Sequence, residues 1–304
     1  FDGRTAGGAY AEGADMADAD YDSYTRVQAS LNWAEYRTGA KVSGLAQAIN
    51  SANGSGLFGN DLFMEEINDA IDELAVQYGA ALYSGNPGAS PVQLAGAALA
   101  VDGSAGTFAN IATATYADWV STEASVAAAA LSKQTIREKL LSPVRYASGQ
   151  RPAVVCVPDD LWDRVKGLAD EGASDIKEMM VNGEMLDIMA ISGVTGVSID
   201  GVPFVNDRHA TTGTMYAINP RFVHIKQVPA SPSSPGRLVQ NVKALTGVDV
   251  TIDEVEARLR RMAGRLQPTV EILSQTGDAY KAQVKIYSQV AWVRRDTHGK
   301  LTVT

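Results

Sequence analysis

The sequence predicts an α+β fold in which one long amphipathic helix packs on antiparallel strands. Residues 60–84 carry apolar side chains at steps of three or four, the period of a helix that buries one stripe. Residues 24–33 alternate apolar and polar side chains, and residues 280–293 form a second long strand-like stretch near the C-terminus. A helix about 36 Å long with a single apolar face needs a sheet or a neighbouring subunit along that face.

The predicted long helix has clear start and stop signals. Asn60 is a suitable N-cap, and acidic side chains in the first turns face the positive end of the helix dipole. The sequence from Gly85 to Gly88 contains a proline and two glycines and ends the helix. The expected buried stripe consists of Phe63, Ile67, Ile71, Leu74, Tyr78 and Leu82.

The N-terminal part of the chain predicts an extended arm followed by a hairpin. Residues 1–20 are rich in Gly, Ala and Asp, and the alternation that follows places Leu31 and Trp33 on one face of a strand. Thr38 and Gly39 offer a turn, after which residues 40–44 can return as a second strand. A two-stranded hairpin is marginal by itself, so we expect it to lean on another part of the assembly.

The remainder of the chain predicts a mixture of helices and short strands. We expect a helix over residues 116–141, ended by Ser142 and Pro143, and a strand over residues 152–157 that leads into a helix capped by acidic residues. Asp200 and Gly201 predict a tight turn in a hairpin over residues 197–205. Further strands are expected over residues 215–218, 222–228 and 269–273, while residues 248–266 fit a strand or a helix.

Composition and charge exclude several classes of protein. The chain has 304 residues, of which 45% are hydrophobic, so it can bury a sizeable core. No apolar run is long enough to cross a membrane and no leader is apparent, so we expect neither membrane insertion nor secretion. A single cysteine, Cys156, excludes an internal disulfide framework. Residues 42–132 hold nine acidic and no basic side chains, so this part of the chain cannot neutralise phosphates.

No catalytic, cofactor or metal site emerges from the motifs. Gly54 to Gly59 fits the spacing GxGxxG, but no buried apolar strand precedes it, so we interpret it as a flexible joint. Asp18, Asp20 and Asp22 resemble the start of a calcium loop that lacks its later ligands. The three histidines stand apart from one another and from any nucleophile motif. We therefore predict a protein that is not an enzyme and holds no cofactor.

The order of these parts along the chain resembles a known family. The resemblance rests on the arm, the hairpin and a set of local patterns, namely Tyr24 to Gly44, Tyr83 to Pro87, Pro152 to Pro158 followed by Leu161 and Trp162, Ile199 to Val205, and Val293 to Leu301. This layout resembles the major capsid protein of tailed bacteriophages, of the Hong Kong 97 type, over nearly the whole chain.

The resemblance implies a division of the chain into named parts. Residues 1–22 correspond to the N-terminal arm, residues 23–52 to the E-loop hairpin, and residues 53–116 to the peripheral domain with its spine helix at 60–84. Residues 117–228 correspond to the axial domain, and residues 229–304 return to the peripheral domain.

The resemblance also suggests which residues contact neighbouring subunits. Some relatives crosslink a hairpin lysine, and Lys41 is the first lysine of this chain. The expected contact residues are Trp33, Tyr36, Lys41, Phe63, Ile71, Arg258 and Arg261.

The implied function is structural. We expect pentamers and hexamers that form an icosahedral shell around double-stranded phage DNA held non-specifically, assembled in the host cytoplasm with portal and with decoration or scaffolding proteins. An encapsulin-type compartment shares this fold and is one alternative. A nucleotide-dependent oxidoreductase that uses the Gly54 loop is an alternative from another class.

Overall fold

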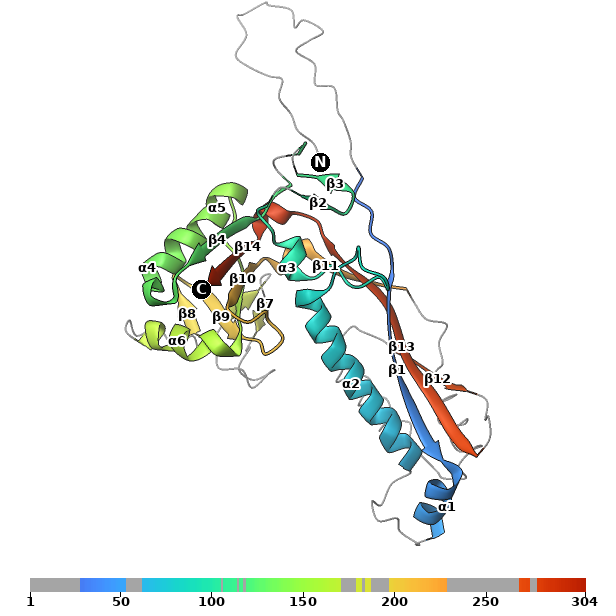
Figure 1. Ribbon diagram of the computed structural model, residues 1–304. Coiled ribbons are helices and arrows are strands. Elements are labelled where there is room, and N and C mark those ends of the chain that lie inside the picture. The colour runs from blue at the N-terminus through green and yellow to red at the C-terminus, as the bar shows by residue number, and fades with distance from the viewer. Residues whose placement is uncertain are drawn as a thin grey trace, which may run out of the picture.

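The chain forms an elongated lobe and a compact lobe, and it passes between them near residues 119–121, 219–222 and 293–298 (Figure 1). The computed structural model describes residues 28–52, 62–104, 106–113, 115–116, 119–170, 179–181, 184–186, 197–228, 268–273 and 278–304. The predicted arm, the Gly54 loop and residues 248–266, including Arg258 and Arg261, lie outside these described residues.

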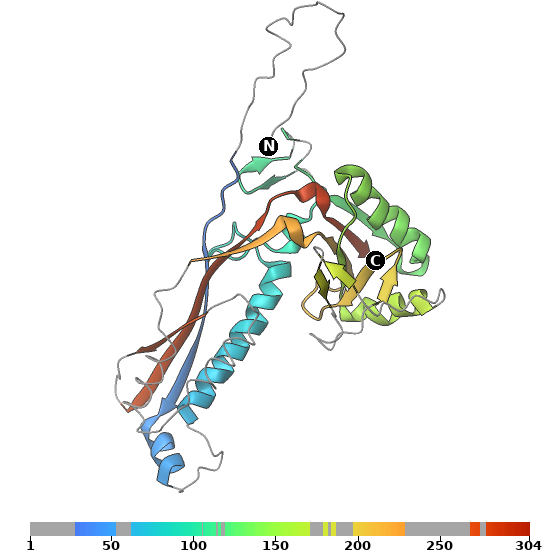
Figure 2. The ribbon, with the colours of Figure 1, turned by 180° about the vertical axis from the view of Figure 1, so that it is seen from behind.

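The elongated lobe consists of a long helix and a four-stranded antiparallel sheet. Its helices and strands are β1 (Ala34–Ser43), α1 (Gly44–Ala52), α2 (Leu62–Ser84), α3 (Ala97–Ala100), β2 (Thr107–Phe108), β3 (Ile111–Ala112), β11 (Val223–Gln227), β12 (Thr269–Leu273) and β13 (Ala279–Trp292). Strand β13 is central, with β1 along one edge and both β12 and β11 along the other. Figures 1 and 2 show α2 lying lengthwise along one side of this sheet.

The compact lobe is built on a six-stranded mixed sheet with the order β4-β14-β10-β5-β9-β8. Its elements are β4 (Thr122–Val126), η2 (Ala128–Ala130), α4 (Lys133–Ile136), the π-helical segment η3 (Arg137–Leu141), α5 (Ser142–Ser148), β5 (Val154–Val157), α6 (Asp159–Asp170), β8 (Val197–Ile199), β9 (Val202–Asn206), β10 (Thr214–Ile218) and β14 (Gly299–Val303). A separate hairpin is formed by β6 (Met179–Val181) and β7 (Glu184–Leu186). Two 3-10 turns, η4 (Pro220–Phe222) and η5 (Arg295–Thr297), lie where the chain passes between the lobes.

The predicted long helix is confirmed as α2, and its apolar stripe is buried. Phe63, Ile67, Ile71, Leu74 and Tyr78 are all buried in the core of the elongated lobe. Five residues of β1 at alternate positions face this helix, as the period of a strand requires. Helix and sheet are also joined by a hydrogen bond, because the Thr38 hydroxyl donates to the carbonyl of Ala70 over 2.7 Å.

The core of the compact lobe lies between one face of its sheet and the helices. Val155, Phe204 and Met215 come from three neighbouring strands and pack with apolar residues of α4, η3 and α6. The hairpin predicted over residues 197–205 is confirmed as β8 and β9. Its turn residues Asp200 and Gly201 both have positive φ angles, 55° and 74°, as a two-residue hairpin turn of type I′ requires.

The hairpin turn predicted at Thr38 and Gly39 is wrong. Both residues lie in the middle of β1, opposite Val284 and Gln283 of β13, and the strand runs straight through them. Pairing with a long partner strand outweighs the local turn preference of glycine. The strand predicted over residues 24–33 is also wrong in its described part, because residues 28–33 are not a strand and Trp33 is 52% exposed.

The helix predicted over residues 116–141 is wrong for residues 119–132 and is confirmed for residues 133–141. Residues 122–126 form β4, which pairs in parallel with β14 at the end of the chain, so distant pairing overrides the helix propensity of the alanines. The helical segment begins at Lys133 and passes through Pro143 to Ser148. Proline lacks the N–H that a helix interior needs, which normally ends a helix. Here a π-helical turn just before Pro143 changes the local hydrogen-bonding pattern, and the helix continues through the proline.

Candidate functional site

The two lobes meet at the C-terminal end of α2. The Tyr83 hydroxyl donates to Oδ2 of Asp207, which follows β9, over 2.7 Å. The Tyr83 ring also packs against the ring of Tyr216 in β10, with centroids 5.5 Å apart. Burial raises the pKa of Tyr83, and it raises the pKa of the neighbouring Cys156 thiol to about 11. Both groups are therefore neutral, and the contact is a packed, hydrogen-bonded joint without a reactive thiolate.

Arg295 lies at the crossover from β13 to β14 and is only 2% exposed. Its guanidinium donates to the carbonyl oxygens of Ala100, Trp119 and Asp102 over 2.6, 2.9 and 3.0 Å. It also lies over the rings of Phe108 and Trp119, 4.8 and 5.8 Å from their centroids. Burial lowers the pKa of Arg295 to about 10, so the group remains charged at neutral pH. One side chain thereby holds two segments of backbone, residues 100–102 and Trp119, against the crossover.

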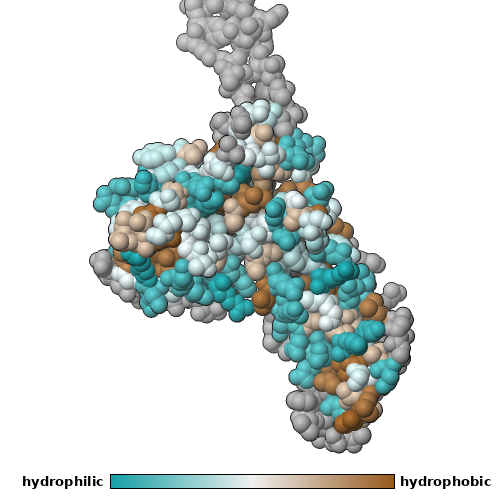
Figure 3. Space-filling view, in the orientation of Figure 1, coloured by the Kyte–Doolittle hydropathy of each residue, from teal (hydrophilic) through white to brown (hydrophobic). Residues whose placement is uncertain are grey.

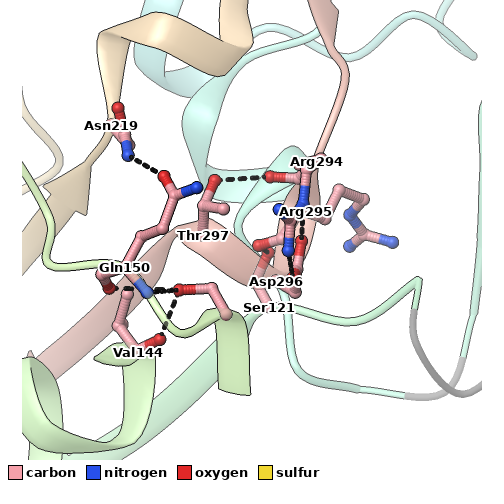
Figure 4. Close-up of polar contacts among 9 residues, drawn as sticks. Ser121, Val144, Gln150, Asn219, Arg294, Arg295, Asp296 and Thr297 are labelled. Atoms are coloured by element: carbon pink, nitrogen blue, oxygen red, sulfur yellow. Dashed lines mark hydrogen bonds and ion pairs between the residues drawn. The ribbon is translucent and has the colours of Figure 1, made fainter. Parts of the chain in front are cut away.

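Polar side chains from both sides of the crossover complete this network (Figure 4). The Ser121 hydroxyl, next to β4, donates to the carbonyl of Arg295 over 2.7 Å. Asn219, in the connection after β10, donates through its amide to Oε1 of Gln150 over 3.3 Å. The crossover is therefore held by segments far apart in the sequence.

His298 follows Arg295 and is fully buried. Its Nδ1 accepts a hydrogen bond from the backbone N–H of Asn219 over 3.2 Å, while Nε2 has no partner among the described residues. Its ring stands edge-on to Trp292, with centroids 5.0 Å apart. Burial is the largest effect on its pKa and Arg295 acts in the same direction, so the value falls to about 4 although Asp296 opposes the shift. His298 is therefore neutral in the folded protein at neutral pH.

Gln289 of β13 holds the segment after α2 against the sheet. Its Oε1 accepts from the N–H of Ala95 over 2.7 Å, and its Nε2 donates to the carbonyls of Asn32 and Gln93 over 2.6 and 3.3 Å. The indole N–H of Trp292 donates to the carbonyl of Ala95 over 2.8 Å. Two strand residues thus satisfy the backbone of a loop that would otherwise be buried without partners.

The outer surfaces of the elongated lobe carry opposite charges. The exposed side of α2 is acidic and the helix contains no Lys or Arg. These exposed acids are Glu66, Asp69, Asp72 and Glu73. The side of the sheet that faces away from α2 carries Arg37, Lys41, Lys281 and Lys285, together with Glu35 and Glu271.

Apolar side chains are exposed at the far tip of the same lobe. Leu45 and Ile49 lie one turn apart on α1 and are 66% and 54% exposed. Figure 3 shows apolar surface gathered at this end of the molecule. An apolar, exposed tip is a common feature of surfaces that are covered in an assembly.

The predicted contact residues fall into different environments. Trp33 and Lys41 are exposed, as a contact requires. Tyr36 is half-buried against α2, where its hydroxyl accepts from the N–H of Leu94 over 3.2 Å. Phe63 and Ile71 are 0% and 1% exposed within the chain's own core, so they support the protomer and offer no surface to a neighbour.

The sequence reasoning missed the residues of the junction. Arg295 and His298 belong to a short polar run between two apolar strands. A charged run between two strands is a signal in the sequence that could have indicated a junction here. In the sequence pattern, Tyr83 stands out only as a residue near the C-terminal end of the long helix. Within the described residues, His, Cys, Asp and Glu form no group of three that could hold a metal ion. No helix in the described part of the chain has the length and apolar character needed to cross a membrane.

Comparison with known protein families identifies the family to which this two-lobed chain belongs. The family model described as SU10 major capsid protein matches residues 2–237, more than three quarters of the chain. The chain belongs to this major capsid protein family. It is a structural, shell-forming protein and not an enzyme, which overturns the oxidoreductase alternative. No curated protein sequence matches the chain.

Solved structures show that this capsid protein has the fold of phage capsid proteins. The chain is similar to the capsid protein of cyanophage A-1(L), with 17% identity, a TM-score of 0.66, and 97% of this chain and 84% of that chain covered. It is also similar to the capsid of a native GTA particle, with 12% identity, a TM-score of 0.52, and 100% and 83% covered. An encapsulin complex from Synechococcus elongatus gives 11% identity, a TM-score of 0.53, and 89% and 73% covered.

For a capsid protein, the junction and the outer surfaces have distinct roles. The junction around Tyr83 and Arg295 fixes how the two lobes of one subunit are joined. The exposed faces are the surfaces from which contacts between subunits are built, and those contacts repeat by symmetry.

Proposed function

We propose that the chain assembles into pentamers and hexamers that close an icosahedral shell around double-stranded phage DNA. The observation that carries this proposal is the family match over residues 2–237, together with the shared fold. An elongated lobe with acidic, basic and apolar outer surfaces is suited to such assembly, because each surface of one copy needs a complementary surface on the next.

The charge distribution supports non-specific packaging of the DNA. The exposed side of α2 carries four acidic side chains and no basic one, so it cannot neutralise phosphates. A lining of this kind repels the nucleic acid and lets it move. We place the acidic side of α2 toward the enclosed DNA for this reason.

The proposal includes the partners that such a shell needs. A portal protein would occupy one vertex, and scaffolding or decoration proteins would contact the inner or outer surface during assembly in the host cytoplasm. Division of the chain into an N-terminal arm, an E-loop, a peripheral domain and an axial domain is part of the same proposal. The elongated lobe corresponds to the peripheral domain and the compact lobe to the axial domain.

An encapsulin-type compartment is the second candidate, because the chain shares its fold with an encapsulin complex at a TM-score of 0.53. Fold alone does not separate a shell around DNA from a shell around protein. The contents of the particle separate the two.

Electron microscopy of the native particle after nuclease treatment, with its nucleic-acid content read by absorbance, tests the proposal. We expect closed icosahedral shells that hold nuclease-protected DNA. Closed shells that hold protein and no DNA would replace the proposal with the encapsulin-type alternative. Small oligomers without DNA would overturn both.

A further inference from the structure

A turn of the compact lobe, residues 207–210, packs on the C-terminal part of α2, and we call it the docking turn. It follows β9 and is closed by a hydrogen bond from the N–H of Ala210 to the carbonyl of Asp207 over 3.0 Å. Ala210 is buried in the core of the elongated lobe, although it lies between two strands of the compact lobe. The compact lobe therefore reaches into the core of the other lobe at this turn.

Gly79, the single glycine of α2, is the place where the docking turn approaches the helix most closely. A Cβ atom built on Gly79 would lie 2.8 Å from Cδ2 and 2.9 Å from Nε2 of His209, closer than atoms that are not bonded to each other pack. Glycine destabilises the interior of a helix relative to alanine, because it loses more conformational freedom on folding. The contact with His209 therefore explains why position 79 carries no side chain.

Hydrogen bonds hold the ring of His209 against Gly79. The backbone N–H of His209 donates to Oδ1 of Asp207 over 2.9 Å, and Nε2 of its ring accepts from Nε of Arg208 over 3.3 Å. The other oxygen of the Asp207 carboxylate accepts from the hydroxyl of Tyr83, which lies one turn beyond Gly79 on the same face of α2. A side chain added at position 79 would therefore push against an ordered turn.

The docking turn lies apart from the places where the chain passes between the lobes. Those passages are near residues 119–121, 219–222 and 293–298, and the guanidinium of Arg295 joins the last to the first through the carbonyl of Trp119. The docking turn belongs to none of them, since it connects β9 to β10 within the compact lobe. The compact lobe is thus held at two places, the crossover and the docking turn. The separation between the docking turn and α2 sets the tilt of one lobe on the other.

We propose that Gly79, by letting the docking turn lie directly against α2, sets the tilt between the lobes and with it the diameter of the assembled shell. Carbon atoms pack about 3.5–4.0 Å apart, so a Cβ atom at 2.8 Å from the ring requires a displacement of roughly 1 Å. Because the crossover holds the compact lobe elsewhere, this displacement tilts the lobe. The same tilt occurs in every copy, and symmetry repeats it around the shell. This inference rests on the proposed assembly.

The diameter of particles formed by glycine variants, measured by cryo-electron microscopy, tests this inference. Gly79→Ala and Gly79→Val add a methyl and an isopropyl group beside the ring of His209. We expect Gly79→Val to shift the particles to a different diameter or to give open, irregular shells, and Gly79→Ala to give a smaller shift. Adding His209→Ala to Gly79→Val removes the ring that the new side chain meets, so we expect the wild-type diameter to return.

Gly167 provides a matched control for the substitution itself. It lies on the exposed side of α6, and a Cβ atom built on it would meet nothing within 4 Å. Gly167→Val is thus the same change inside a helix, without a neighbour to displace, and should leave the diameter as in wild type. His209→Ala alone should also keep the wild-type diameter, because the hydrogen bond between Tyr83 and Asp207 still holds the docking turn on α2.

Closed particles of wild-type diameter from Gly79→Val would overturn the inference and leave the shell-forming function intact. A changed diameter that persists after His209→Ala is added, or one that Gly167→Val produces equally, would overturn it as well. If the Gly79→Val chain is insoluble, wild-type particles from the double variant support the inference, and an insoluble double variant overturns it. Absence of particles from the wild-type protein would instead overturn the proposed function, and this inference with it.

Discussion

Arg295 shows how a buried cation can be accommodated without a carboxylate partner. Its guanidinium is satisfied by three carbonyl oxygens and two aromatic rings rather than by a carboxylate. Arginine suits this position because its planar fork presents several donors in fixed directions. A lysine has the charge but cannot reach three separated carbonyls with the same geometry.

Replacing Arg295 should therefore be costly. We expect Arg295→Met to lower the free energy of unfolding by about 3–5 kcal/mol, because it leaves buried carbonyls without donors. The neighbouring Arg294 is a matched control, since it is partly exposed and pairs locally with Asp296. Arg294→Met should cost less than about 1 kcal/mol. Thermal unfolding of the two variants measures the difference, and equal midpoints would contradict the assigned role.

His298 predicts a pH dependence of stability. Its folded pKa of about 4 lies below the ordinary value of 6.5, so the unfolded chain binds a proton more readily than the folded chain. The stabilisation is complete above about pH 6.5 and is lost as the pH falls toward 4, by up to about 3 kcal/mol.

The unfolding midpoint between pH 7 and pH 4.5 measures this effect. We expect His298→Gln to flatten the profile relative to wild type in that range. His224 lies exposed on β11, so His224→Gln should keep the wild-type slope. A slope unchanged by His298→Gln would assign the pH dependence to other groups.

At the scale of elements, α2 carries the core of the elongated lobe on one stripe. We expect Ile71→Asp to cost about 4 kcal/mol or more, because it places a carboxylate where the side chain is 1% exposed. Val76 lies on the exposed side of the same helix, so Val76→Asp should change the free energy of unfolding by less than about 0.5 kcal/mol. The yield of soluble protein and its unfolding midpoint distinguish the two, and a fully stable Ile71→Asp protein would contradict the packing of α2 on the sheet.

The elements that were predicted correctly are those whose signal is local. The stripe and stop of α2, the turn at Asp200 and Gly201, and the strands β12 and β13 depend on spacing and on turn chemistry. The errors at Thr38 and in residues 122–126 arose where a strand's partner lies far away, in β13 or β14. Residue spacing does not identify a distant partner strand.

The candidate site was less predictable than the fold for the same reason. Arg295 meets Ala100 and Trp119 across more than 170 residues of sequence, and Gln289 meets Asn32 across 257. Such contacts exist only after both lobes have formed. The like-charged pairs on the outer side of the sheet, Arg37 with Lys285 and Lys41 with Lys281, also become visible only in the register of β1 and β13.

At the scale of the whole molecule, the two lobes are held in one arrangement by a small number of contacts. The chain passes between them before β4, at η4 and at η5, and Tyr83 adds a side-chain connection at the end of α2. A subunit that must fit a closed shell needs a fixed arrangement of its two lobes, because an error in one copy is repeated by symmetry.

Tyr83→Phe tests this connection with minimal change in packing. The ring against Tyr216 stays, while the hydrogen bond to Asp207 is lost, at an expected cost of about 1 kcal/mol. Because local opening sets amide exchange, we expect hydrogen exchange to become about fivefold faster in β10 and in the last turn of α2. The first turns of α2 around Phe63 are the internal control and should exchange as in wild type. Faster exchange throughout α2 would mean that the hydroxyl stabilises the helix as a whole, and unchanged exchange at both places would mean that the crossover near Arg295 alone holds the lobes together.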